Sequence, residues 1–483
     1  MQAQCLSFSN IPESSKLFLD FLYAFPRVSR YYGHPPYATA ELLSAEPPRQ
    51  SPEHRSQIAD VLRDQNRRWG ASERTLSNIE LLRGGAGAIV TGQQVALFGG
   101  PAYTLYKALT AIKLAQRATE AGNPCVPIFW MATEDHDLAE VNHVFFPAPD
   151  GRLHRLATES HGEEDQPVGS IKLGEDIGPH VQWIKDNFGT SEVCSWLEEC
   201  YRPGATFAEA FARFLCRVFN DHGLIIVDPM DGRFHKIAAP LYSQVISQSQ
   251  ILNEQLLERN KELEEAGYHA QVKVTESTSL LFALDERQRI PIHRKNGSFE
   301  IRDQIISPEQ LQRQLAEATE RFSANALLRP VVQDYLFPTL AYVGGSAEVA
   351  YFAQSEILYH HLLGRTTPIL PRFSATLIEP RIAQWLEKYR LQAREVMCSE
   401  AELQVELARR VLPGDLQKRL QESKGGLDAM LSPLTESLRK LDPTLAEAAE
   451  VASRKMHYQL ERIGEKAASA EVRRNGEITR HAT

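Results

Sequence analysis

The most chemically capable stretch of this sequence is the run EDHD at residues 134–137, followed by Asn142 and His143. Carboxylates beside a histidine can orient the imidazole as a general base, or can hold a polar substrate. The same residue types can also bind a metal ion. Helix capping plus a locally satisfied histidine is the structural alternative. Because capping explains only one of these ionisable residues, we predict a functional site that includes His136 and Asp137.

A second candidate is the glycine-rich turn within residues 91–104, which reads TGQQVALFGGPAYT. Its backbone N–H groups and the N-terminus of the following helix can bind an anion. Lys107, one turn into that helix, can assist. The turn is neither a G-x-G-x-x-G fingerprint nor a P-loop, and a purely structural turn is the alternative.

Two further clusters lie in the second half of the chain. Residues 344–346, Gly-Gly-Ser, precede a helical pattern, and Glu348 near its start can bind an amine. Arg372 follows a strand-like run at residues 368–370 and suits a carboxylate or a phosphate. A tight turn with an N-cap, and a surface arginine, are the structural alternatives.

These clusters follow short apolar runs that predict buried strands. Residues 88–90 and 126–131 flank a helical pattern at 102–120, which together predict a βαβ unit, with a polar turn at 91–94. Ligands of α/β proteins bind at the carboxyl ends of parallel strands. We therefore expect one binding cleft, formed by residues 91–94, 134–137 and 344–348.

Composition narrows the class of protein. The 483 residues are 43% hydrophobic with a net charge of −9, enough for a large core and without the basic runs of a nucleic-acid-binding protein. No apolar segment reaches the ~20 residues of a membrane-spanning helix, and the N-terminus does not resemble a signal peptide. Six scattered cysteines form no C-x-x-C pair. We expect a reduced, cytoplasmic protein.

The core is expected to be interrupted twice. The predicted core comprises residues 1–150, 205–236 and 329–378. The first insertion, 151–204, carries a helix near 179–187. The second, 237–328, carries a long helix at 237–266 and a small antiparallel sheet at 272–302. Residues 53–83 are also predicted to be helical.

The last part, residues 379–483, is predicted to be a helical coiled-coil domain. Its leucines repeat at spacings of four and three residues, as in an a/d heptad seam, at Leu427, Leu431, Leu434, Leu438, Leu441 and Leu445. Ser432-Pro433 and Asp442-Pro443 each resemble an N-cap followed by proline at the first helical position. Two helices folding back near Asp442 as an antiparallel hairpin, or one kinked helix, fit this pattern. We expect the seam to support a homodimer.

Four motifs together resemble the BshC family of bacillithiol biosynthesis. They are TGQQ-x4-GGPAYTLYKALTAIKLA, FWMATEDHD-x4-NHV, LRPVVQDYLFPTLAYVGGSAEVAYFAQ and PRFSATLIE. The resemblance implies an α/β fold with a Rossmann-like core like that of class I aminoacyl-tRNA synthetases, two connecting insertions and a dimerising C-terminal coiled coil. The implied activity is that of a ligase joining L-cysteine to the amine of glucosaminyl-malate, the last step of bacillithiol formation.

Residues at matching motif positions are the expected substrate-binding residues. They are Thr91, Gln93, Gln94, Gly100, Asp135, Asn142, Gly345, Glu348, Tyr351 and Arg372. His136 and Asp137 match the same motifs and are the expected catalytic residues. Two departures from the family pattern stand out: Ser346 stands where Gly-Pro is expected before Glu348, and the chain is expected to lack a C-terminal segment that follows the coiled coil in relatives. In addition, Tyr103 and Tyr106 occupy the places of the synthetase ATP-binding histidines.

Three functions remain open from the sequence. The first is the cysteine ligase, with cysteine and glucosaminyl-malate as its small-molecule partners and neither nucleic acid nor membrane among them. A nucleotide, ATP or ADP, is the candidate activator, and no metal is expected. The second is a nucleotidyltransferase-like enzyme of other substrate, and the third is a catalytically impaired dimeric binding protein.

Overall fold

The computed structural model describes residues 3–148, 152–160, 162–285, 288–411 and 414–474. Its contacts divide the chain into two compact units. One unit is Ser15–Ser374, and the other combines Met1–Ser14 with Ala375–Thr483. Within the described ranges, no helix is both long enough and apolar enough to cross a membrane.

A five-stranded sheet forms the centre of the larger unit. Its order is β12-β11-β1-β2-β5, and all four pairings are parallel. The strands are β1 (Gly87–Gln93), β2 (Cys125–Met131), β5 (Ile225–Val227), β11 (Thr339–Gly344) and β12 (Ile369–Pro371). Strands β1, β2 and β11 are buried almost throughout, as expected for a sheet covered on both faces.

Strand β1 is longer than its apolar run predicts. Gly92 and Gln93 pair in register with Trp130 and Met131 of β2, so most of the predicted polar turn at 91–94 belongs to the strand. Gly92 is required there, because a Cβ would lie 2.8 Å from the Trp130 carbonyl oxygen. The polarity of these residues therefore marks the end of the strand, where it meets solvent, and not a chain reversal.

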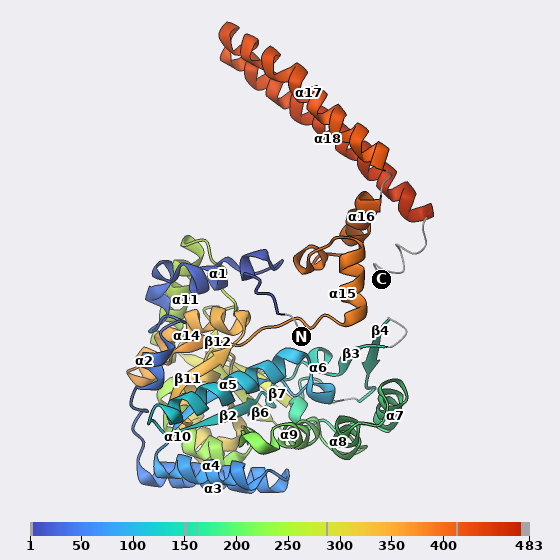
Figure 1. Ribbon diagram of the computed structural model, residues 1–483. Coiled ribbons are helices and arrows are strands. Elements are labelled where there is room, and N and C mark those ends of the chain that lie inside the picture. The colour runs from blue at the N-terminus through green and yellow to red at the C-terminus, as the bar shows by residue number, and fades with distance from the viewer. Residues whose placement is uncertain (1–2, 149–151, 161, 286–287, 412–413, 475–483) are drawn as a thin grey trace. The chain divides into compact units, whose positions relative to one another are not determined.

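Helices cover both faces of the sheet (Figure 1). Helix α5 (Ala102–Glu120), predicted at the same bounds, packs against β1, β2 and β11. Helices α3 (Pro52–Arg68) and α4 (Glu73–Gly84) pack near β5. Residues 53–83 are thus two helices, because Gly70 has a φ of +77° and the Ser72 side chain caps α4. The remaining helices of this region are α1 (Lys16–Tyr23), α2 (Thr39–Leu43), α9 (Phe207–Val218), α13 (Arg329–Leu336) and α14 (Ser346–Leu363).

Helix α3 completes the open edge of the sheet at β5. The Asn66 side-chain amide exchanges hydrogen bonds with the backbone N–H and C=O of Ile226, at 3.1 and 2.8 Å. Gln65 does the same for Asp228, at 3.1 and 2.9 Å. These buried amides take the place of a missing neighbouring strand, so the edge is not free to pair with another chain.

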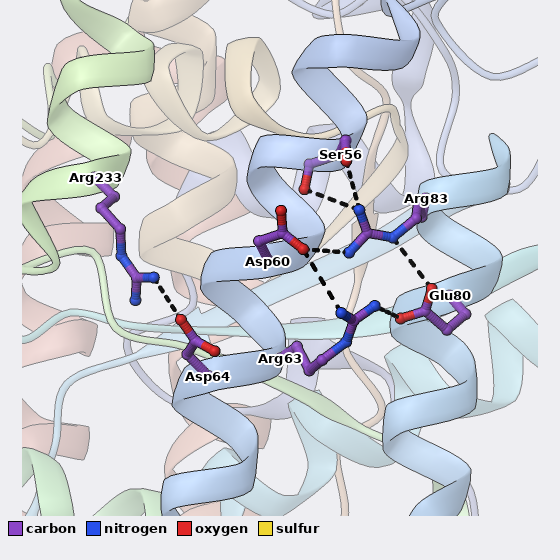
Figure 2. Close-up of polar contacts among 7 residues, drawn as sticks. All are labelled: Ser56, Asp60, Arg63, Asp64, Glu80, Arg83 and Arg233. Carbon is purple, nitrogen blue, oxygen red and sulfur yellow. Dashed lines mark hydrogen bonds and ion pairs between the residues drawn. The ribbon is translucent and has the colours of Figure 1, made fainter.

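Charged side chains join α3 to its neighbours on the outer side (Figure 2). Arg83 of α4 binds Asp60 at 2.6 Å and Glu80 at 3.1 Å, and Arg63 bridges the same two carboxylates. Arg233 of α10 (Gly232–Ser247) binds Asp64 at 2.6 Å. A network that shares its charges in this way is worth more than isolated surface pairs.

The two segments predicted as insertions contain the following elements. The first contains β4 (Leu153–Ala157), which pairs with β3 (His143–Pro147), and helices α7 (Ile177–Phe188) and α8 (Glu192–Cys200). Helix α7 confirms the helix predicted near 179–187. A short helix, α6 (Leu138–Val141), precedes β3. The predicted helix at 237–266 is two helices, α10 and α11 (Ser249–Glu265), which meet at Gln248.

The predicted small antiparallel sheet is present and has five strands. Its order is β10-β6-β7-β8-β9, with β6 (Thr278–Asp285), β7 (Gln288–Lys295), β8 (Ser298–Ile301), β9 (Gln304–Ile306) and β10 (Phe322–Ala324). Helix α12 (Pro308–Glu317) begins with a capping box between Ser307 and Gln310.

The smaller unit is helical. It contains α15 (Pro380–Lys388), α16 (Glu400–Val411), α17 (Gly414–Leu441) and α18 (Pro443–Arg474). Helices α17 and α18 lie side by side (Figure 1), and the pairs Lys424–Glu461 and Arg439–Glu450 show that they are antiparallel. The predicted hairpin at Asp442 is confirmed. A helix start at Pro433 is wrong, because α17 runs through that proline.

Candidate active site

The carboxyl ends of β1, β2 and β11 border a cavity of about 510 Å³. Because the three strands are parallel and in register, the predicted clusters at 91–94, 134–137 and 344–348 lie on the same edge of the sheet. This confirms the expected convergence. The residues that line the cavity include Gln93, Gln94, Tyr103, Lys107, Trp130, Asp135, Glu140, Gln271, Val272, Arg329, Tyr342, Gly345, Glu348, Tyr351 and Arg372.

One wall of the cavity is organised by a buried ion pair. Lys107 of α5 is 4% exposed, and its Nζ lies 2.5 Å from Glu348 Oε2. The same ammonium donates to the Gly92 carbonyl at 3.0 Å and to Gln93 Oε1 at 2.8 Å. All three of its donor positions are therefore used. Lys107 joins the end of β1 to the start of α14, and it orients the Gln93 amide so that its NH₂ group is left to donate elsewhere.

Glu348 is fully engaged by the chain itself. Its Oε2 also accepts from the Gly345 N–H at 2.6 Å, and its Oε1 accepts from the Tyr342 hydroxyl at 2.6 Å. The amine that it binds is thus the one of Lys107, which corrects the expectation of a substrate amine at this position. Gly345 is likewise not an open anion cradle, because its N–H is used by Glu348.

Burial and pairing compete in setting the charges of this pair. Burial lowers the pKa of Lys107, and the neighbouring Glu348 offsets only part of that shift. For Glu348 burial raises the pKa, but the Lys107 charge and the hydrogen bonds to the carboxylate outweigh it and leave the pKa below its ordinary value. We regard the pair as ionised, since three donors stabilise the carboxylate.

The depressed pKa of Glu348 predicts an acid-dependent loss of stability. A carboxyl group whose pKa falls on folding stabilises the protein above its unfolded value, 4.5, and that contribution is lost as the pH falls through the folded value. The difference in free energy of unfolding between wild type and Glu348→Gln, measured with urea from pH 7 to pH 3, should therefore shrink below pH 4.5. A difference that stays constant over this range would show that Glu348 is not ionised in the folded protein.

Two guanidinium groups face the same cavity. Arg329 donates to the Tyr351 hydroxyl at 2.7 Å and lies over the Tyr342 ring. Arg372 donates to Ser374 Oγ at 2.6 Å and lies over the Tyr103 ring. In the described part of the chain, neither has a carboxylate within ion-pair distance, so both remain available to an anionic ligand.

The opposite wall, beyond β1, is acidic. The Gln94 side-chain NH₂ donates to Asp135 Oδ2 at 2.8 Å and to Glu140 Oε2 at 2.6 Å. Asp135 Oδ1 also accepts from the His136 N–H at 2.8 Å. One neutral amide therefore holds two carboxylates next to each other, which leaves negative charge to attract an ammonium group.

Seven of the predicted site residues line the cavity: Gln93, Gln94, Asp135, Gly345, Glu348, Tyr351 and Arg372. Five do not. Thr91 is buried, and its hydroxyl donates to the Val343 carbonyl at 2.8 Å. Asn142 Oδ1 lies 3.2 Å from His143 Nδ1. Asp137 caps α6 by accepting from the Glu140 N–H at 3.2 Å. The other two are Gly100 and His136.

The glycine turn that contains Gly100 is structural. The Gly99 N–H donates to the Tyr201 hydroxyl at 2.8 Å, and the Gly100 N–H donates to the Leu97 carbonyl at 3.0 Å. A Cβ on Gly99 would lie 2.7 Å from the Phe214 ring. The two glycines have φ values of +88° and +73°, which favour glycine. The Gly99 and Gly100 amides are therefore used within the chain and are not free to bind a phosphate.

His136 lies outside the lining residues, with its ring exposed. Its Nε2 is 3.9 Å from Asp165, and its Nδ1 is 3.9 Å from Asp135.

An acid–base role for His136 stays a prediction. If it transfers a proton in the rate-limiting step, His136→Asn should lower turnover by about 10²–10⁴-fold with the unfolding free energy unchanged. Turnover equal to that of wild type would leave Asp135 as the acid–base candidate of this cluster.

The alternative of a metal site at residues 134–143 is not supported by their geometry. In the described residues, no three His, Cys, Asp or Glu side chains are grouped as metal ligands.

Several lining residues were not singled out from the sequence, among them Glu140, Arg329, Gln271 and Val272. Arg329 had a usable signal, because a cation at the first position of a helix opposes the helix dipole and suggests another role. Gln271 and Val272 come from the second insertion, and nothing local distinguishes them from other loop residues.

The parallel sheet, with a charged cavity at its carboxyl edge, defines a Rossmann-like α/β protein. The chain belongs to the BshC family. A family model described as "Bacillithiol biosynthesis BshC, N-terminal Rossmann-like domain" matches residues 1–373, and a second, described as the "C-terminal coiled-coil domain", matches residues 375–483. The family's C-terminal domain is therefore present, which corrects the expectation that a C-terminal part is missing.

Similar proteins carry the name "Putative cysteine ligase BshC". The one from Koribacter versatilis (strain Ellin345) is 41% identical over 482 residues, which cover 100% of this chain and 91% of the relative. The one from Solibacter usitatus (strain Ellin6076) is 37% identical, over 98% of this chain and 89% of the relative. A more distant relative, from Bacillus cytotoxicus, is 28% identical over 84% of this chain and 77% of its own length.

Proposed function

We propose that this chain is a ligase that forms an amide between L-cysteine and the amine of glucosaminyl-malate, completing bacillithiol. The observation that carries the proposal is the bipolar cavity. Two guanidinium groups, Arg329 and Arg372, and two carboxylates, Asp135 and Glu140, line this one cavity. The relatives named as cysteine ligases support the same reaction class.

The chemistry of the substrates fits this distribution of charge. Glucosaminyl-malate carries an amine at one end and two carboxylates at the other, so it can align along the gradient between the two walls. Arg329 and Arg372 suit its carboxylates, because guanidinium groups bind carboxylates in a bidentate way. Asp135 and Glu140 suit the amine, and a carboxylate next to it can accept the proton that it must lose before it attacks.

Condensation of a free carboxylate with an amine requires activation of the carboxyl group. A nucleotide remains the expected activator in the cytoplasm, where cysteine stays reduced. The Gly99 and Gly100 amides are not assigned to it, because both are already used within the chain.

The proposal is tested by deleting the gene and measuring both metabolites. We expect bacillithiol to disappear and glucosaminyl-malate to accumulate, with recovery on expression of the wild-type gene. Normal bacillithiol in the deletion strain would exclude the ligase. Loss of a different metabolite would favour a nucleotidyltransferase-like enzyme, and an unchanged metabolite profile would favour a binding protein.

We also propose that the protein is a homodimer through its C-terminal helices. Several seam residues stay exposed in a single chain: Leu434 is 51%, Leu445 45% and Leu441 79% exposed. A second copy across a two-fold axis would cover them.

We expect sedimentation at micromolar concentration to show a wild-type dimer and a monomeric Leu434→Lys/Leu438→Lys variant, because unpaired charges cannot be buried. Glu436→Lys, on the same helix, is the control, and a monomeric wild type would contradict the proposal.

A further inference from the structure

An irregular segment of the second insertion, residues 266–277, forms part of the cavity wall. It joins α11 to β6, and Gln271 and Val272 are the residues that line the cavity. An irregular segment of this kind normally has several accessible conformations. Here buried side chains from two helices hold its backbone.

The central restraint comes from Gln354 of α14, which is fully buried. Its Oε1 accepts from the Val272 N–H at 2.9 Å, and its Nε2 donates to the Val272 carbonyl at 2.9 Å. The same Nε2 donates to Asn260 Oδ1 at 2.7 Å, which fixes the orientation of the amide. Gln354 thus pairs with Val272 as a neighbouring strand would.

Two further contacts hold the ends of the segment. Asn253 of α11, 2% exposed, donates to the carbonyls of Thr275 and Thr278 at 2.8 and 3.0 Å. The buried Tyr268 hydroxyl donates to Asp20 Oδ2 at 2.9 Å. Buried polar groups are costly unless they are paired, so two amides and one hydroxyl that restrain this loop favour a single backbone conformation.

Helix α14 connects this wall to the charges of the site. It carries Glu348 and Tyr351 at its start and Gln354 one turn later. The position of Gln271 is therefore set by the same rigid helix that positions Glu348 and Tyr351.

We propose that Gln271 contacts the sugar hydroxyls of the acceptor substrate and that Gln354 is its positioning residue. This inference rests on the proposed function. A hydroxyl both donates and accepts hydrogen bonds, and a neutral amide offers both in return. The exposed side chain of Gln271 makes a long contact of 3.4 Å from its Oε1 to His269 Nε2, whereas Gln94, Glu348 and Lys107 are held in shorter bonds. Gln271 is thus free to exchange a weak contact for a substrate hydroxyl.

Gln271→Ala is the direct test. Loss of one or two neutral hydrogen bonds should weaken calorimetric binding of glucosaminyl-malate, and raise its KM, by about three- to tenfold. The KM for cysteine should not change. Equal affinity of wild type and variant for glucosaminyl-malate would overturn the proposal.

Gln354→Met tests the positioning role with a side chain of similar volume. Hydrogen exchange at the Val272 amide should accelerate at least tenfold, and the KM for glucosaminyl-malate should rise as in Gln271→Ala. The matched control is Gln312→Met, which removes a glutamine bound to the Ser243 carbonyl at 2.8 Å and to Ser247 Oγ at 3.0 Å and leaves the cavity intact. Unchanged exchange at Val272, or an equal KM effect in the control, would overturn the positioning role.

The binding measurement separates this inference from the proposed function. Wild-type protein that binds glucosaminyl-malate but forms no product would exclude the ligase, while the variant affinities would still decide the role of Gln271. Wild-type protein that does not bind glucosaminyl-malate would overturn both.

Discussion

Replacing Lys107 with methionine should lower the free energy of unfolding by about 3–5 kcal/mol, because it leaves the Glu348 carboxylate buried without its counter-ion. The Lys107 and Glu348 side chains are only 5% and 13% exposed, so solvent cannot replace the lost partner. The measurement is urea denaturation at pH 7, with the same slope expected for wild type and variant.

The double variant Lys107→Met/Glu348→Met should be more stable than Lys107→Met alone, since removing both charges avoids an unpaired one. A matched control is Lys185→Met. Lys185 pairs with Glu198 at 2.9 Å, but Glu198 is 59% exposed, and surface pairs contribute about 0–1 kcal/mol. A loss no larger than that of the control would mean that the buried pair is not ionised.

Replacing Arg329 with methionine should reduce kcat/KM for amide formation by about 10- to 150-fold, which corresponds to the loss of hydrogen bonds to a charged group. The effect should appear mainly in the KM for glucosaminyl-malate, because Arg329 is one of two guanidinium groups available to its carboxylates. The kcat/KM of Arg329→Lys should lie between those of wild type and Arg329→Met, since lysine keeps the charge but loses the planar pair of donors.

Arg321→Met is the control for this prediction, because Arg321 is an exposed arginine that lies shortly before Arg329 in the chain. The unfolding free energy of each variant is measured in parallel to show that the fold is retained. A kcat/KM within twofold of wild type for Arg329→Met would remove this residue from the binding site and leave Arg372 as the cationic group.

Local patterns in the sequence determined the elements and the edge at which the site forms. Apolar residues recur at helical spacing along the buried face of α5, so the bounds of this helix could be predicted from residues 102–120 alone. The strands at 88–90 and 126–131 were recognisable for the same reason. Since their polar ends must lie at the carboxyl edge of a parallel sheet, the clustering of residues 91–94, 134–137 and 344–348 also followed from the sequence.

Local sequence patterns predicted helix boundaries less reliably, both where a helix is interrupted and where it runs through a proline. Gly70 and Gln248 divide helices that the sequence pattern predicted as single, because both flanking segments carry apolar residues at helical spacing. Pro433 shows the opposite case. It reads as a helix start, but α17 continues through it, since packing along α18 outweighs the hydrogen bond that proline removes.

The partners within the site were decided only by the tertiary structure. Which amine Glu348 binds depends on where α5 and α14, elements far apart in the chain, lie against the central sheet, and the sequence pattern of neither helix indicates it. The same holds for Gln354 and Val272, which meet because the second insertion folds back onto the core. A sequence pattern reports which side chains are buried or exposed, whereas the identity of a long-range hydrogen-bond partner depends on how the elements pack.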